Sequence, residues 1–181
     1  MKRKSRLTIG IAAAALFTLA GATVFAQDKQ DKYTLKTPSG IAFSEFKGYE
    51  DWVVVSSALT PNDRLKVMVA NPTMIAAYRA GIPGNGQPFP DGSKIAKLQW
   101  KFKKSTEAPF DVNVPDTFAE AFLMVKDSKR FPDSGGWGYA LFNYDPATDK
   151  FTPDPAPANC GHACHVAVKS KDYIFHPYQK R

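Results

Sequence analysis

Two cysteines and a histidine near the C-terminus are the residues best suited to do chemistry in this sequence. The stretch NCGHACHVAVKSKDYIF, residues 159–175, holds the chain's only cysteines, Cys160 and Cys164, and His165 directly follows the second. In an exported protein two cysteines most often form a disulfide. A bridge across three residues closes so short a loop that its stabilisation would be modest, and it leaves the position of His165 unexplained.

A zinc site is a second interpretation of the same residues. Two thiolates could bind zinc together with His162, His165 or His176 in a tetrahedral arrangement. The two cysteines and His165 lie so close in sequence, however, that they cannot easily surround one ion without strain. Structural zinc is also uncommon in an oxidising compartment.

Haem attachment explains the whole cluster. Each thiol can add to a vinyl group of haem, and the histidine after the second thiol then lies under the iron. The usual motif is C-x-x-C-H; here the spacing is C-x-x-x-C-H, and Gly161 can help the loop absorb the extra residue. We therefore expect Cys160 and Cys164 to hold one c-type haem and His165 to be the proximal iron ligand. His162 and His176 are expected in an exposed loop and in the surface tail.

The first 26 residues have the features of a secretory signal. A basic start, MKRKSR, precedes an apolar run that ends in small residues, with Val24 and Ala26 at positions suited to signal peptidase. We expect cleavage near Ala26 and an exported mature protein that begins at Gln27. An uncleaved membrane anchor is the alternative, because the run is almost long enough to span a bilayer.

The charge distribution argues against nucleic acid as a partner. The formal net charge is +7, and removal of the signal takes away four positive charges and no negative ones, which leaves +3. The remaining lysines are scattered among acidic and aromatic residues, whereas phosphate binding needs a concentrated basic surface. A mildly basic surface could instead help docking to an acidic electron-transfer partner.

The rest of the sequence predicts one α+β domain, mainly an antiparallel sheet with a few short helices and the haem near the C-terminus. A polar arm, 27–40, leads into a single domain, 41–181. Residues 40–52 are weakly helical, and Asn71, Pro72 and Gly81 delimit a short helix. Alternation and β-branched residues predict strands at 52–59, 65–71, 93–104, 119–127 and 135–145.

The methionines bear on the sixth position of a haem iron. The mature chain carries Met68, Met74 and Met124, each within an apolar stretch where core packing is expected. We therefore expect an open distal iron site that binds or turns over a small ligand.

Four segments in this order resemble the cytochrome P-460 family and the related cytochromes c′-beta: WVVVSS, FPDGSKIAKLQWK, MVKDSKRFPDSGGWGYALF and CGHACHVAVKSKDYIF. The resemblance runs from about Trp52 to Phe175. It implies a periplasmic c-haem protein on a largely antiparallel sheet, usually a homodimer, with His165 as the proximal ligand.

The resemblance implies one of two functions. Cytochromes P-460 oxidise hydroxylamine and carry a lysine crosslinked to the haem, whereas the c′-beta proteins lack the crosslink and bind nitric oxide or carbon monoxide. Lys97 is where we place the family lysine, with Lys94 as second choice. Alternation puts Lys97 on a face with Gln99 and Lys101, which could point to solvent, and Lys94 on the apolar face.

Other residues are candidates for supporting roles. Proton transfer near the iron could use a carboxylate, and access to the iron could be limited by aromatic side chains. The acid candidates are Glu120, Asp127 and Asp133, and the aromatic ones are Phe43, Phe89 and Phe122. A third hypothesis is that the chain is a haem-free exported module with one disulfide.

Overall fold

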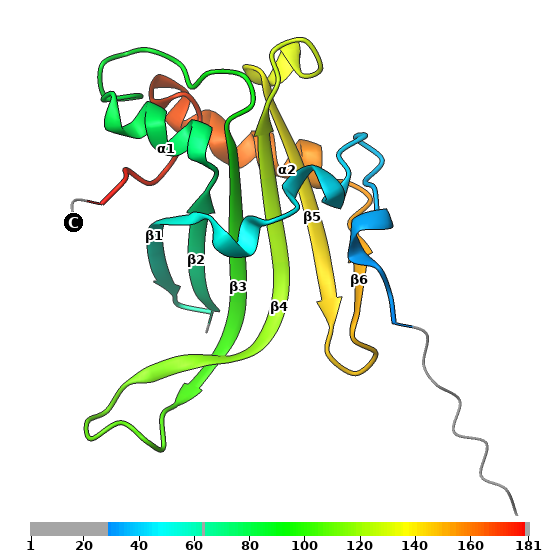
Figure 1. Ribbon diagram of the computed structural model, residues 1–181, viewed down its shortest axis with the longest axis vertical. Coiled ribbons are helices and arrows are strands. Elements are labelled where there is room, and N and C mark those ends of the chain that lie inside the picture. The colour runs from blue at the N-terminus through cyan, green and yellow to red at the C-terminus, as the bar shows by residue number, and fades with distance from the viewer. Residues whose placement is uncertain (1–28, 63, 180–181) are drawn as a thin grey trace, which may run out of the picture.

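Alternating apolar and polar residues build a six-stranded antiparallel sheet in this protein. The computed structural model describes residues 29–62 and 64–179 (Figure 1). The strands follow one another across the sheet in chain order, each antiparallel to its neighbour. They are β1 (Val53–Thr60), β2 (Arg64–Ala70), β3 (Lys94–Lys104), β4 (Asn113–Lys126), β5 (Trp137–Asp145) and β6 (Lys150–Pro153).

Within the described residues, two α-helices accompany the sheet. Helix α1 (Pro72–Arg79) begins where the Asn71 side chain accepts the N–H of Met74, with Pro72 in the first turn. Helix α2 (Pro157–His165) carries both cysteines and ends at the histidine that follows them. Short 3₁₀ turns occupy Lys32–Thr34, Phe43–Phe46, Tyr49–Asp51, Pro132–Ser134 and Val166–Lys171.

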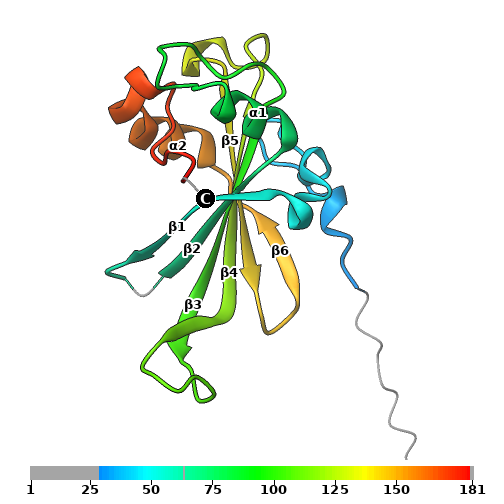
Figure 2. The ribbon, with the colours of Figure 1, turned by 60° about the vertical axis from the view of Figure 1, so that its left-hand side comes forward.

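The sheet buries apolar side chains on both faces, and different parts of the chain cover each face. The segment before β1 crosses one face, while α2 and the C-terminal residues lie on the other (Figure 1 and Figure 2). The first core contains Ile41, Phe43, Phe46, Tyr49, Ala96, Leu123 and Phe142. The second contains Met68, Met74, Tyr78, Phe89, Ile95, Met124, Trp137, Tyr139 and Tyr173.

Strand register aligns the side chains that face α2. Directly paired residues in neighbouring strands point to the same face of a sheet. One row across four strands is Met68, Lys97, Phe122 and Leu141. The next row is Ala70, Ile95, Met124 and Tyr139. Lys97 therefore shares its face with the second core.

Most of the expected elements are confirmed. All five predicted strands and the helix after Asn71 are present, and β4 starts earlier than predicted. The weak helix at 40–52 is instead two 3₁₀ turns, because Gly48 adopts a left-handed φ of 85° between them. Strand β6 was not predicted from the sequence. The cysteine segment was also expected to be a loop, which is wrong, since Cys160, Gly161 and Cys164 are helical.

The predicted polar arm is described from residue 29 onward, and it contacts the domain. Tyr33 and Leu35 pack against the core on their face of the sheet, and Lys36 forms a β-bridge with Ala42. The predicted signal segment, 1–26, lies outside the described residues. Within 29–62 and 64–179, no helix is long and apolar enough to cross a membrane.

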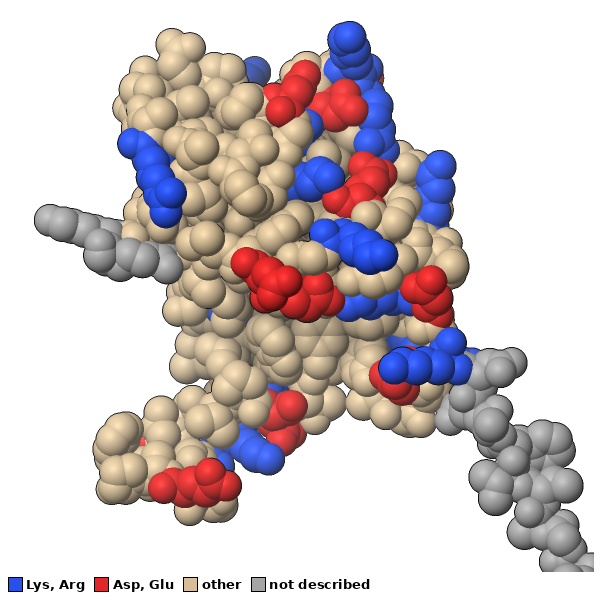
Figure 3. Space-filling view, viewed as in Figure 1, with Lys and Arg blue, Asp and Glu red and all other residues tan. Residues whose placement is uncertain are grey.

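Basic and acidic side chains alternate over the face seen in Figure 3 without forming a block of one sign. Ion pairs of the described residues include Lys32 with Glu50 at 2.7 Å and Arg130 with Glu45 at 2.8 Å.

Helix α2 approaches β5 closely at Gly161. A Cβ atom at this position would lie 2.7–2.9 Å from ring and Cβ atoms of Tyr139, well inside van der Waals contact. The absence of a side chain therefore sets the distance between the helix and the strand.

Gly161→Ala should lower the free energy of unfolding by about 1–3 kcal/mol, since the added methyl group overpacks this contact. The intrinsic helix preference of alanine, worth about 1 kcal/mol, acts in the opposite direction. Denaturant unfolding of the haem-loaded protein measures the difference. The matched control is Ala163→Leu, at an exposed position of the same helix. A Gly161→Ala protein as stable as the parent would show that the contact does not limit the approach of α2.

Candidate functional site

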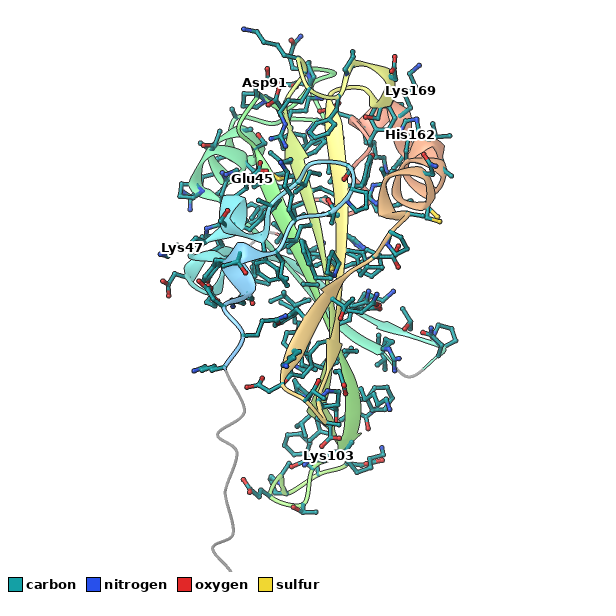
Figure 4. All side chains as sticks on the ribbon, turned by 90° about the vertical axis from the view of Figure 1, so that its right-hand side faces the viewer. Glu45, Lys47, Asp91, Lys103, His162 and Lys169 are labelled. Atoms are coloured by element: carbon teal, nitrogen blue, oxygen red, sulfur yellow. The ribbon has the colours of Figure 1, made fainter. Side chains whose placement is uncertain are left out.

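A cavity of about 630 Å³ lies between the sheet and the segment formed by α2 and the C-terminal residues. Its sheet wall is made of Lys66, Met68, Ile95, Lys97, Phe122, Met124 and Tyr139. Its opposite wall comprises Cys160, Gly161, Cys164, His165, Ile174, Phe175 and His176. Figure 4 shows α2, marked by His162, on one side of the sheet and Glu45 and Lys47 on the other. The volume is that of a typical cofactor pocket.

The helical conformation of α2 presents both cysteines to the cavity. Residues four apart lie one above the other on a helix, with Cβ atoms about 5–6 Å apart. Both thiols are free, exposed and part of the cavity wall. A disulfide needs Cβ atoms about 3.5–4.5 Å apart, so the helix would have to distort before Cys160 and Cys164 could pair.

His165 is held in an orientation suited to binding a metal through Nε2. Its Nδ1 lies 2.5 Å from the backbone oxygen of Tyr173, and a carbonyl can only accept, so Nδ1 carries the proton. The ring packs against Tyr139 and edge-on to Phe175, with centroids 5.3 and 4.7 Å away. Burial lowers the pKa of His165, which favours the neutral imidazole that metals bind.

The same residues do not form a site for an isolated metal ion. Within the part of the chain that the structure describes, no three histidine, cysteine, aspartate or glutamate side chains gather closely enough to hold one. Cys160, Cys164 and His165 are spread along the cavity wall instead of converging on a point. The geometry therefore offers no support for the zinc interpretation.

Lys97 extends from β3 into the cavity. Its Nζ lies 3.8 Å from the centroid of the Phe122 ring, in a cation–π contact. Burial, and next the positive charge of Lys66, lower the pKa of Lys97 to about 8. The face that Lys97 shares with Gln99 thus forms the cavity wall and does not point to solvent.

Lys94, the second choice for the family lysine, lies on the other face of β3. Its Nζ donates to the backbone oxygen of Glu45 and lies 5.8 Å from the centroid of the Phe46 ring. These contacts are with the segment before β1. The structure therefore separates Lys94 from the cysteines and His165.

The three acid candidates lie at different places. Glu120 is on the Lys97 face of β4, two residues from Phe122, and its charge raises the pKa of Lys97. Asp127 accepts the N–H groups of Lys129 and Arg130 and so caps its own turn. Asp133 is exposed in a 3₁₀ turn. Among the three, Glu120 alone acts on a residue of the cavity.

Other polar residues also line the cavity, among them Lys66, Asp154 and His176, and the sequence did not predict them there. Lys66 lies two residues before Met68 and therefore on the same face of β2, so the strand pattern contained a signal for it. Asp154 and His176 come from connecting segments, where no periodicity indicates direction. His176 is half-buried, and burial lowers its pKa, so it is more than the surface tail expected from the sequence.

The methionines and phenylalanines divide between the cavity and the cores. Met68, Met124 and Phe122 line the cavity. The other three residues are buried in the cores: Met74, Phe43 and Phe89. Of the three phenylalanines expected to limit access to the iron, only Phe122 lies in a position to contact a ligand in the cavity.

The residues present fit a haem group. Two thiols on one helix face, a neutral imidazole with its Nδ1–H already engaged, and an apolar opposite wall surround a space of cofactor size. If haem binds here, Cys160 and Cys164 would hold its vinyl edge and His165 its iron.

The fold and the site together define a haem-binding protein. The sequence profile of the family Cytochrome P460 matches residues 46–176, and this chain belongs to that family. The family implies a haem cofactor and a cytochrome of the haem c type. No curated protein matched the chain.

His165→Gly should leave haem attached but open the proximal position of the iron, since only the side chain that meets the metal is removed. Imidazole added to the purified variant should restore the spectrum of the parent. His176→Gly, a half-buried histidine of the same cavity, is the control and should keep the parent spectrum without imidazole. If the two variants behave in the opposite way, His176 and not His165 is the ligand.

Proposed function

We propose that this chain is an exported, periplasmic mono-haem cytochrome that oxidises hydroxylamine. The haem is attached through thioethers to Cys160 and Cys164, His165 is the proximal ligand, and Lys97 is crosslinked to the haem macrocycle. The observation that carries the proposal is the position of the Lys97 amine inside the cavity, where its pKa is lowered to about 8. A neutral amine is the form that can bond to carbon.

Haem supplies the iron at which hydroxylamine binds and the path by which its electrons leave to an acceptor protein. The chain's residues prepare this site. His165 would hold the iron, and its ring is in contact with Tyr139 and Phe175. Phe122, Met68 and Met124 exclude water from the sheet wall, so that a small polar substrate meets few competing ligands.

Oxidation of hydroxylamine releases protons as well as electrons, and they must leave a largely apolar cavity. Glu120 is the candidate base among the predicted acids, because its charge acts on Lys97. Asp154 lines the cavity as well and offers a second carboxylate. His176 has a pKa lowered by burial, and its neutral ring can accept a proton.

Lys97→Ala tests the proposal. The parent, matured in a host that attaches c-type haem, should show a strongly red-shifted Soret band after reduction with dithionite, and Lys97→Ala should show an ordinary c-haem spectrum. Hydroxylamine oxidation should fall to background in the variant. Lys101→Ala, an exposed lysine of the same strand, should keep both properties. An ordinary spectrum in the parent itself would exclude the crosslink.

A second candidate function is binding of nitric oxide or carbon monoxide without turnover. The observation that favours it is the apolar wall next to Lys97, made of Phe122, Met68 and Met124. Such a wall suits an uncharged diatomic ligand. In this case Lys97 stays a free amine beside the iron.

Azide binding distinguishes a free Lys97 from a crosslinked one. A free Lys97 is an ammonium group below pH 8 and stabilises the bound anion; above pH 8 it is neutral and the attraction is lost. The affinity of the ferric protein for azide should therefore fall by about tenfold more between pH 7 and pH 9 in the parent than in Lys97→Met. Parallel curves would show that no free amine titrates beside the iron.

We also propose an acidic electron-transfer protein as the physiological acceptor, because the mature chain is expected to be mildly positive. A homodimer is proposed as the assembly from the resemblance to the family.

A further inference from the structure

We propose that the buried ion pair between Lys126 and Asp172 is a positioning device for His165. It fixes the backbone carbonyl of Tyr173 against the Nδ1–H of the histidine, and so sets how strongly the imidazole donates to iron. This inference rests on the assignment of His165 as the iron ligand.

The pair is almost fully enclosed. Lys126 is 4 % exposed and Asp172 10 % exposed, and Nζ lies 2.7 and 2.9 Å from the two carboxylate oxygens. The third partner of the ammonium group is the backbone oxygen of Gly135, at 2.8 Å. Three acceptors match the three N–H bonds of a lysine, so the direction of the side chain is fully determined.

Asp172 carries this restraint to the C-terminal segment. Its Oδ2 also accepts the backbone N–H of Phe89 at 2.8 Å, which ties the carboxylate to the long connection before β3. Phe89 is itself fully buried against Tyr78 and Trp137. The carboxylate is therefore held from two independent directions.

The backbone at this point has an uncommon conformation. Asp172 has a φ of 46° and Tyr173 a φ of 63°, two consecutive left-handed residues that are not glycine. Such residues are uncommon and persist where the surroundings determine them. The turn aims the carbonyl of Tyr173 at Nδ1 of His165, 2.5 Å away.

The Gly-Gly-Trp-Gly stretch and the Lys-Asp-Tyr segment lie next to each other at the ion pair. Gly135 and Gly136 have φ values of 66° and 82°, and a Cβ on Gly135 would lie 2.2 Å from the Tyr173 ring. A Cβ on Gly136 would lie 3.3 Å from Cε of Lys126. The Gly-Gly-Trp-Gly stretch thus makes room for both the ion pair and Tyr173, and it connects to the Lys-Asp-Tyr segment through them.

The functional consequence follows from how an imidazole donates to a metal. A hydrogen bond from the other ring nitrogen to a carbonyl fixes the tautomer and orientation and raises the basicity of the ligand. If the carbonyl of Tyr173 moves away, the bond from His165 to iron weakens and the ferrous state becomes relatively more stable.

The experiment measures the iron–histidine stretching frequency of the reduced, haem-loaded protein by resonance Raman spectroscopy, together with its reduction potential. Lys126→Met and Asp172→Ala should both lower the frequency and raise the potential, and the double variant should show no more than the larger single effect. Asp172→Asn keeps the size of the side chain and an acceptor for Phe89, and asparagine tolerates a positive φ. It should fold even if Asp172→Ala does not, and should shift both readings in the same direction by a smaller amount.

Two controls separate positioning from general stability. Lys171→Met removes an exposed charge beside Asp172 and should leave both readings unchanged. Phe142→Leu lowers stability from the core on the opposite face and should also leave them unchanged. Variants of the pair that lose stability as Phe142→Leu does, but keep the parent frequency and potential, would overturn the proposal. A parent without any iron–histidine band would instead mean that His165 is not the ligand.

Discussion

The site depends on how closely helix α2 can lie against strand β5. Gly161 allows the helix backbone to rest on the ring of Tyr139, and this contact leaves a cavity of defined width beside it. The four-residue spacing of the cysteines determines the direction of both thiols only because the segment is helical. On a helix it brings both thiols to one face, directly toward the cavity, and leaves the histidine at the helix end, where the next segment can fix its ring.

One face of the sheet forms a closed core, and the other face forms the wall of the cavity. The segment before β1 seals one face with Ile41, Phe43 and Phe46. The other face is only partly filled by its own side chains, and the remaining space is the cavity. The surroundings of a lysine in β3 therefore depend on the face of the sheet to which it points. Lys97 is enclosed beside Phe122, while Lys94, on the other face, donates a hydrogen bond to the backbone of Glu45.

The sequence was sufficient to predict five of the six strands, because alternation over β3 and the β-branched residues of β1 are strong local signals. It also pointed to the two cysteines and His165 as a group. It could not show that α2 is a helix, since a short segment with alanine, glycine and cysteine has no apolar periodicity. The direction of Lys97 was also undetermined. Both faces of β3 are covered, so alternation alone does not reveal which one holds the ligand.

Peptide mapping of the mature protein tests the central claim most directly. After digestion of protein purified from a host that attaches c-type haem, the peptide with Cys160 and Cys164 should carry the mass of haem. If Lys97 is crosslinked, the peptide that contains it should remain joined to the same haem. Two unmodified cysteines that react fully with an alkylating agent would contradict the assignment of this site as a covalent haem site.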